Sequence, residues 1–119
     1  HTEQVDKDIA DSLKHLSPNG LIMLHDTNPG SYESQLVPRT QTIWNGDVWK
    51  SVVKLRCSNP DLEIFTVDTD CGCAVLKRGN QKLYDRVPLS AALNWNYFCV
   101  NKKELLNLIS IEEFSAKNI

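Results

Sequence analysis

Apolar residues recur at helical spacing near the start of the chain and then form a short continuous run. The first stripe has intervals of four, four and three residues, which predicts an amphipathic helix over residues 2–16. Its members are Val5, Ile9, Leu13 and Leu16. Pro18 and Gly20 end the helix, because proline cannot continue its hydrogen-bond ladder. The apolar run 21–24 lacks alternation, which predicts a strand with both faces covered by helices.

A second helix and a hairpin are predicted further along the chain. Residues 48–57 carry an apolar stripe, with Asn45 as the expected N-cap and Asp47 in the first turn, where a carboxylate complements the helix dipole. Residues 62–67 have the composition of a strand. A turn over 68–72 and a returning strand over 73–77 follow, so the two strands form an antiparallel hairpin.

Polar segments separate these elements. Residues 27–42 show no period and predict a long loop, which in a compact domain is often functional. Residues 79–89 are again polar and rich in turn residues. Beyond them, we expect a helix over 101–109 capped by Asn101 and a further helical turn over 111–114.

This order of elements predicts an α/β fold. We expect a partial Rossmann-like sheet, in which parallel strands precede the antiparallel C-terminal hairpin and a helical tail follows. One domain spans residues 1–119, with its core in 1–78 and the mostly helical tail in 79–119. A sheet of about three strands is smaller than the usual four to six. The chain is therefore expected to be the C-terminal part of a larger domain.

Composition narrows the classes of function. The chain has 119 residues, 41% of them hydrophobic, and a formal net charge of −2 with no basic stripe. This charge argues against a nucleic-acid partner. No apolar stretch approaches the roughly 20 residues of a membrane span, and no signal peptide is recognisable. We therefore expect a cytoplasmic protein without a membrane partner.

Four cysteines are present, and their spacing matches no standard zinc pattern. They are Cys57, Cys71, Cys73 and Cys99. Cys71 and Cys73 flank Gly72 at the predicted hairpin turn. We interpret the four as free cysteines that act as small buried apolar residues.

His25 and Asp26 are the strongest candidates for chemistry, because open α/β sheets place their sites where a buried strand becomes a loop. An imidazole can remove a proton from a hydroxyl, and a nearby carboxylate can orient it. Asp26 and Asn28 also offer oxygen ligands for Mg²⁺ or a similar cation, with His1 or His25 as base or further ligand. The structural alternative makes His25 an ordinary strand-end residue and Asp26 a turn cap.

A second group of candidates would contact a substrate. Trp44 and Asp47 stand at the start of the second helix and could wall a pocket or bind a sugar hydroxyl. Tyr32 and Arg39 lie in the long loop and could contact the same substrate. The structural alternative is an ordinary capped helix with Trp49 in the core and solvated loop residues.

Several motifs together resemble a known family. They are the initial His1, the helix stop over 16–20, the strand ending in His25-Asp26, Asn28-Pro29, and the segments 44–50 and 67–72. The pattern resembles the C-terminal half of class I S-adenosylmethionine-dependent methyltransferases, in particular a bacterial branch found beside glycan and secondary-metabolite genes. The likeness covers residues 1–78 and, more loosely, 95–107.

The resemblance implies a fold and an activity. Residues 21–24 correspond to the fifth strand of that family, the hairpin to its sixth and antiparallel seventh strands, and His1 follows the fourth. The implied cofactor is S-adenosylmethionine, with a divalent metal such as Mg²⁺ permitted. A small molecule or a glycan is the implied acceptor, and O-methylation is the implied reaction.

One departure limits this expectation. The five glycines stand at scattered turns and form no cradle for a nucleoside, so the family's cofactor-binding turn is absent. Two hypotheses remain. The chain is the acceptor-side half of a methyltransferase and is inactive alone, or it is a non-catalytic methyltransferase-like module used in assembly. An uncovered sheet edge would also favour a homo-oligomer.

Overall fold

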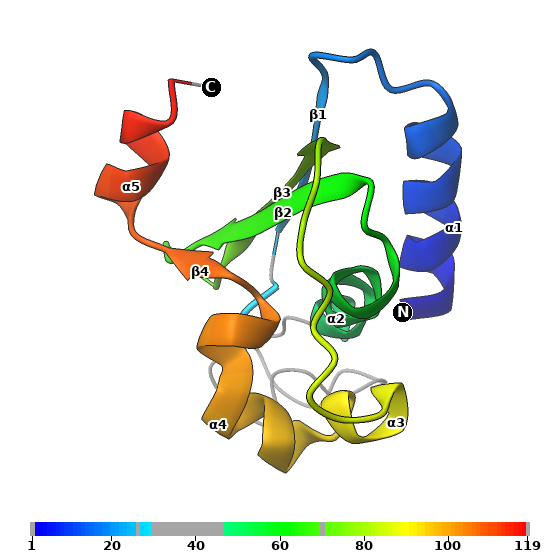
Figure 1. Cartoon of the computed structure of the whole chain (residues 1–119), viewed down its shortest axis with the longest axis vertical. Helices are drawn as coiled ribbons and strands as arrows, with labels where there is room; N and C mark the ends of the chain where they lie inside the picture. The colour runs from blue at the N-terminus through cyan, green and yellow to red at the C-terminus, as the bar shows by residue number, and fades with distance from the viewer. Residues whose placement is uncertain (1, 26, 30–46, 70, 119) are drawn as a thin grey trace, which may run out of the picture.

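The computed structural model describes residues 2–25, 27–29, 47–69 and 71–118, and Asn45 lies outside this part of the chain. Figure 1 shows a sheet with helices on both of its faces. In chain order the elements are α1 (Thr2–Lys14), β1 (Leu21–His25), α2 (Val48–Ser58), β2 (Leu62–Val67), β3 (Cys73–Arg78), α3 (Leu89–Ala92), α4 (Trp95–Leu105), β4 (Leu108–Ile109) and α5 (Ile111–Ala116). The predicted α/β fold is confirmed, and the arrangement is consistent with a partial Rossmann-like sheet.

Strand β3 occupies the interior of the sheet, whose order is β1-β3-β2-β4. It is antiparallel to both neighbours, with Leu76 opposite Ile22 on one side and Ile64 on the other. Strands β1 and β2 therefore run parallel to each other although they do not touch. The predicted parallel pair and antiparallel hairpin are confirmed, and the hairpin's second strand separates the parallel pair.

The prediction that helices cover both faces of β1 is wrong. Ile22 and Leu24 pack against the main core, whereas Leu21, Met23 and His25 are exposed on the opposite face. Alternation in exposure arises because successive strand side chains point to opposite faces. The sequence does not show this alternation in exposure, because the outward-facing residues 21 and 23 are apolar as well. Strand β1 is thus an edge strand with one open face.

The prediction of a single helix over 101–109 is also wrong. Helix α4 begins earlier, at Trp95, and Asn94 caps it by accepting a hydrogen bond from the Tyr97 N–H at 3.1 Å. Asn101 lies inside the helix rather than at its start. After Leu105 the backbone reverses at Asn107, whose φ of 49° breaks the helical path. The chain then forms β4, a fourth strand parallel to β2.

The last helical turn forms as predicted. Helix α5 begins with a capping box, in which the Ser110 hydroxyl accepts from the Glu113 N–H and the Glu113 carboxylate accepts from the Ser110 N–H. Phe114 on this helix packs over Phe65, with ring centroids 6.0 Å apart. Helix α5 thereby covers β2 and β4 on the face of the sheet opposite the main core.

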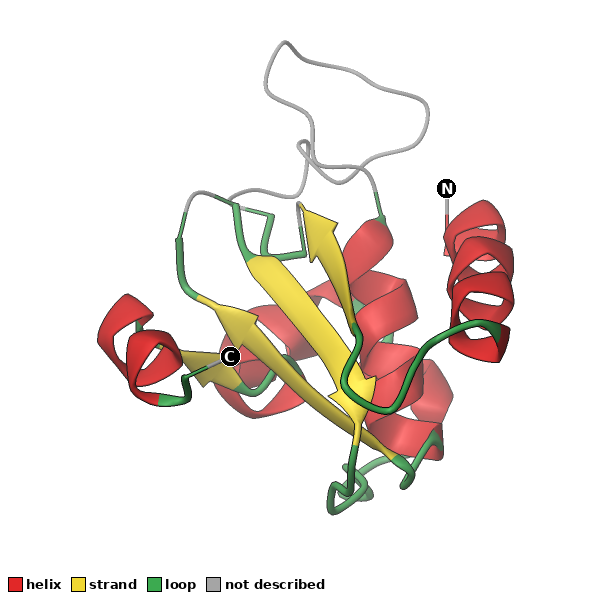
Figure 2. Cartoon of the chain, turned by 90° about the horizontal axis from the view of Figure 1, so that it is seen from above, coloured by secondary structure: helices red, strands yellow, loops and turns green. Residues whose placement is uncertain are grey.

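The main core lies between the sheet and helices α1 to α4 (Figure 2). Trp49 of α2 is completely buried at its centre, as predicted. Its ring lies 4.2 Å from Phe98 and 6.0 Å from Trp95, measured between centroids. Aromatic pairs at such separations stabilise a core beyond their area burial. The segment after β3 is therefore part of the same core as α2.

Arg56 joins the end of α2 to the end of α4. Its guanidinium donates to the backbone oxygens of Glu104 and Leu105, at 2.8 and 3.2 Å, and to the Gln81 side chain at 2.8 Å. Carbonyls in the last turn of a helix lack partners within the helix, so a cation there satisfies them. Arg56 thus supports the end of α4 just before the reversal at Asn107.

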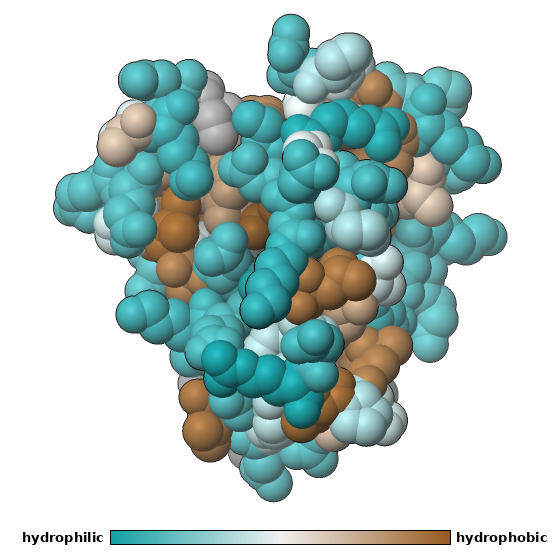
Figure 3. All heavy atoms as spheres, viewed as in Figure 1, coloured by the Kyte–Doolittle hydropathy of each residue, from teal (hydrophilic) through white to brown (hydrophobic). Residues whose placement is uncertain are grey.

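One face of the molecule shows how its apolar side chains are distributed. The face seen in Figure 3 is mostly hydrophilic, with brown patches divided by polar side chains. Within the described residues, no helix is both long and apolar enough to cross a membrane.

Truncation of the core tryptophan tests the position of α2. Trp49→Ala is expected to lower the free energy of unfolding by about 3–5 kcal/mol, because it leaves a large cavity against Phe98. Urea denaturation followed by circular dichroism measures this. Val100→Ala is the control, since Val100 is 83% exposed on α4 and its loss should cost less than about 0.5 kcal/mol. Equal losses in the two variants would contradict the packing described.

A pH dependence follows from a pair of tyrosines. The Tyr84 and Tyr97 hydroxyls are hydrogen-bonded to each other, and burial together with this bond raises the pKa of Tyr84 to about 12. The folded state therefore favours the neutral phenol. This contribution to stability is complete below the ordinary pKa of 10 and is lost as the pH rises through about 12.

Urea unfolding at about pH 9 and about pH 11 measures the effect. The unmodified protein should lose more stability between the two pH values than Tyr84→Phe, which has no phenol to ionise at this position. An identical loss in both proteins would show that Tyr84 titrates normally.

Candidate functional site

The carboxyl ends of β1 and β2 meet at one edge of the sheet. His25 ends β1 and Val67 ends β2, and both pair with Cys73 at the start of β3. Figure 2 shows the ends of these two strands on the same side of the sheet. Edges of this kind hold the sites of open α/β proteins, because several strands deliver loop residues to one place. His25, a candidate from the sequence, therefore lies at an edge of this kind.

The segment after β1 is attached to the turn between β2 and β3. The Asn28 N–H donates to the Cys71 oxygen at 2.7 Å, and the Thr27 N–H donates to the Gly72 oxygen at 3.4 Å. Gly72 has a φ of +87°, a region that side-chain-bearing residues rarely adopt. A Cβ at Gly72 would also stand only 2.7 Å from the Asn28 Cβ. Glycine at this position lets the two segments come into contact.

Three oxygen atoms near this edge are buried without a hydrogen-bond partner within the described part of the chain. They belong to the Thr27 hydroxyl, the Asn28 side-chain amide and the Thr66 hydroxyl. Thr27 and Thr66 are completely buried, and Asn28 is half-buried. A buried polar group without a partner costs about 1–3 kcal/mol, so such groups often mark functional positions. The Asn28 oxygen is therefore suited to accept a hydrogen bond or to ligate a hard cation.

The structure places three of the sequence-predicted site residues. His25 is exposed at the end of β1, and Asn28 follows it on the segment held by the turn. Asp47 is half-buried at the position that precedes α2 and does not cap the helix through its side chain. The remaining predicted residues lie outside the described part of the chain. These are His1, Asp26, Tyr32, Arg39 and Trp44.

A cluster of ligating side chains is the other possible basis for a metal site. Among residues 2–25, 27–29, 47–69 and 71–118, no group of three histidine, cysteine, aspartate or glutamate side chains is arranged to hold a metal ion. The expected Mg²⁺ ligands were Asp26 and Asn28, of which only Asn28 is described. The Asn28 oxygen fits a ligand role because it is buried and has no hydrogen-bond partner among the described residues.

Cysteine chemistry does not add to the site. All four cysteines are free. Cys73 is buried, as predicted, and Cys99 is exposed, against the prediction. Burial raises the pKa of the Cys73 and Cys57 thiols, although Arg56 partly opposes the rise at Cys57. Thiols with raised pKa values are poor nucleophiles at neutral pH.

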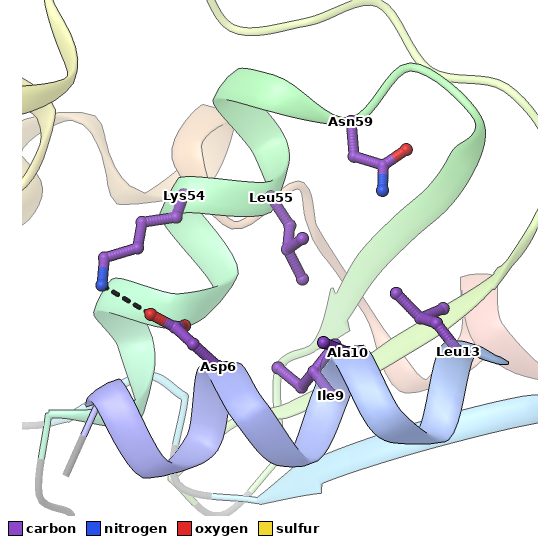
Figure 4. A pocket seen from close by; sticks show the side chains of 7 residues that line it. All are labelled: Asp6, Ile9, Ala10, Leu13, Lys54, Leu55 and Asn59. Atoms are coloured by element: carbon purple, nitrogen blue, oxygen red, sulfur yellow. Dashed lines mark hydrogen bonds and ion pairs between the residues drawn. The ribbon is translucent and has the colours of Figure 1, made fainter.

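A separate hollow lies between α1 and α2 (Figure 4). Ile9, Leu13 and Leu55 give it an apolar lining, and the Lys54 ammonium pairs with the Asp6 carboxylate at 2.7 Å on one side. The two charged groups in the lining thus contact each other. We interpret this hollow as part of the contact between the two helices and assign no chemistry to it.

Sequence reasoning missed the importance of Thr27 and Gly72. Thr27 was assigned to a polar loop, yet it is fully buried, and polar composition gave no sign of this. Gly72 was recognised as a turn residue, but its contact with Asn28 depends on tertiary structure. The Cys71-Gly72-Cys73 triplet was the available signal, because a glycine at a turn often marks close backbone approach.

Comparisons of the chain with family models, with curated proteins and with solved structures found no match. The geometry of this strand edge and the motifs in the sequence are therefore the observations that bear on function.

Substitution of the turn glycine tests the geometry of the edge. Gly72→Ala is expected to lower the free energy of unfolding by at least about 1–2 kcal/mol, because alanine is strained at positive φ and its Cβ meets Asn28. Urea denaturation measures this loss. Gly79→Ala is the control, because its φ is not in the left-handed region and its nearest contact is a looser 3.1 Å. A larger loss in the control would contradict the described turn.

Proposed function

We propose that the chain forms the acceptor side of an S-adenosylmethionine-dependent methyltransferase that O-methylates a small molecule or a sugar. The observation that carries this proposal is the position of His25 at the carboxyl end of β1, beside the segment that the β2–β3 turn holds through Asn28. The antiparallel β3 after the parallel strands agrees with the strand directions that the sequence motifs imply. The proposal includes the cytoplasm as compartment, in keeping with four free cysteines.

His25 acts as the general base in this mechanism. Its imidazole accepts the proton of the acceptor hydroxyl while the oxygen forms a bond to the methyl carbon. Transfer of that methyl group would release a neutral thioether from the cofactor, so the charges balance once His25 holds the proton. The cofactor, when bound, supplies the electrophilic methyl group. His25 is exposed, so an acceptor can approach it from solvent.

The neighbouring residues orient the acceptor. Asn28 and Asp26 would hold a divalent cation that positions the acceptor oxygen, and the buried Asn28 oxygen is in keeping with this role. Asp47, Tyr32, Arg39 and Trp44 would contact the acceptor. The methyl donor would be bound by a separate part of the complete protein, because the glycines of this chain form no cofactor cradle.

A methyl-transfer assay tests the proposal. The protein encoded by the complete reading frame is incubated with S-adenosylmethionine carrying a labelled methyl group and a panel of hydroxyl-bearing small molecules and sugars. His25→Ala should reduce transfer to any accepted substrate by about 100-fold or more, because general-base catalysis contributes at least that factor. His15→Ala is the matched control, since His15 is exposed beyond the end of α1.

A binding measurement with S-adenosylmethionine distinguishes the loss of the base from the absence of a cofactor site. Calorimetry should find that His25→Ala binds S-adenosylmethionine as tightly as the unmodified protein, because His25 acts on the acceptor. No binding by the unmodified protein would refute the enzyme and favour the non-catalytic module. Full activity in His25→Ala would refute the assigned base.

A further inference from the structure

The amino end of β1 borders a hollow of about 500 Å³. Side chains from the sheet, from the turn before β1 and from the end of the chain line it. They are Pro18, Asn19, Leu21, Lys77, Arg78, Lys117 and Asn118. Leu21 and Lys77 are cross-strand partners, so both belong to the same face of the sheet. This is the face that β1 leaves open.

Three cations and no carboxylate line the hollow. Arg78 donates to the Leu13 backbone oxygen at 2.6 Å, which anchors its guanidinium. The Lys117 ammonium lies 4.8 Å from the centre of the Phe65 ring and 3.9 Å from the Glu63 carboxylate. Lys77 is half-buried and has no ion pair within the described residues. Arg78 follows Lys77 along β3, so the two side chains leave opposite faces of the sheet, and Glu63 is the cross-strand partner of Lys77. Three cations therefore border the hollow, and the Glu63 carboxylate lies on the same face as two of them, Lys77 and Lys117.

Apolar surface continues from the hollow along β1. Leu21 is 38% exposed and Met23 is 50% exposed, and both lie on the same face as Lys77. Phe114 of α5 packs with the second core cluster of Phe65, Val67 and Val75, which leaves Leu21 and Met23 exposed on β1. A cationic hollow is therefore joined to an exposed apolar strip.

We propose that this surface binds a small amphipathic anion, a molecule with a phosphate or carboxylate group and a short apolar body. The anionic group lies among Lys77, Arg78 and Lys117, and the apolar body covers Leu21 and Met23. Cations that are held close together with few counter-charges attract an anion more strongly than isolated surface lysines do. Covering exposed apolar area adds about 25 cal/mol per Å² removed from water.

The shape and charge of the surface favour a small molecule over a polymer. The cations border a single hollow, whereas a nucleic acid requires a basic stripe along its backbone. The site is also separate from the proposed methyl-transfer site. Leu21 and His25 stand at opposite ends of β1, about 13 Å apart at ~3.3 Å per residue. The two proposals can therefore fail independently.

Calorimetric titration at constant ionic strength tests this site, with phenyl phosphate and inorganic phosphate as probes. Phenyl phosphate should bind at least tenfold more tightly than inorganic phosphate, because only the former covers the apolar strip. Lys77→Gln should weaken both probes by about tenfold. Met23→Ser should weaken phenyl phosphate alone. The control is Lys102→Gln with Lys103→Gln, which removes two cations from α4 and should leave binding unchanged.

Lys77→Gln is preferred to Arg78→Gln because the Arg78 guanidinium also holds the Leu13 carbonyl. Thermal unfolding of each variant confirms that it is folded before titration. An absence of saturable phenyl phosphate binding would overturn the proposal. An equal loss of binding in the α4 control would also overturn the proposal, because it would show that net charge drives binding. Binding to anionic lipid vesicles without binding to phenyl phosphate would overturn it as well.

Discussion

The pairing of β3 with strands on both of its sides is the constraint on which the remaining structure depends. Residues 73–76 are buried, so this strand requires a neighbour at each edge and cover on each face. The tight turn after β2 makes β3 antiparallel to β2, and β1 then pairs on the free side. The register that results places His25, Cys73 and Val67 in one row, which creates the edge where the candidate site lies.

The same constraint explains the two distinct surfaces of β1. As the outer strand it packs Ile22 and Leu24 against the main core and leaves Leu21, Met23 and His25 on the open face. Its carboxyl end carries the proposed base, and its amino end borders the cationic hollow. Gly72 completes the first site, because only a residue without a side chain allows the turn to contact Asn28.

Local signals in the sequence predicted most elements. Helical spacing located α1 and α2, and the composition of 62–77 located the hairpin. Tertiary contacts decided the remainder. The exposure of Met23 depends on the position of β1 at the edge of the sheet. Helix α4 ends at Leu105 because Asn107 adopts positive φ and β4 joins β2.

At the candidate site, the strand-end position of His25 was predictable from the sequence. The burial of Thr27 was not, because it depends on contact with a turn some 45 residues later.

Backbone nuclear Overhauser effects between strands test the interior position of β3 most directly. Cross-strand contacts are expected from β3 to both neighbours, including Val75 with Met23 and Val75 with Phe65. No backbone contacts are expected directly between β1 and β2. Direct contacts between Met23 and Phe65 would place β1 beside β2, and would contradict both the strand order and the edge that holds His25.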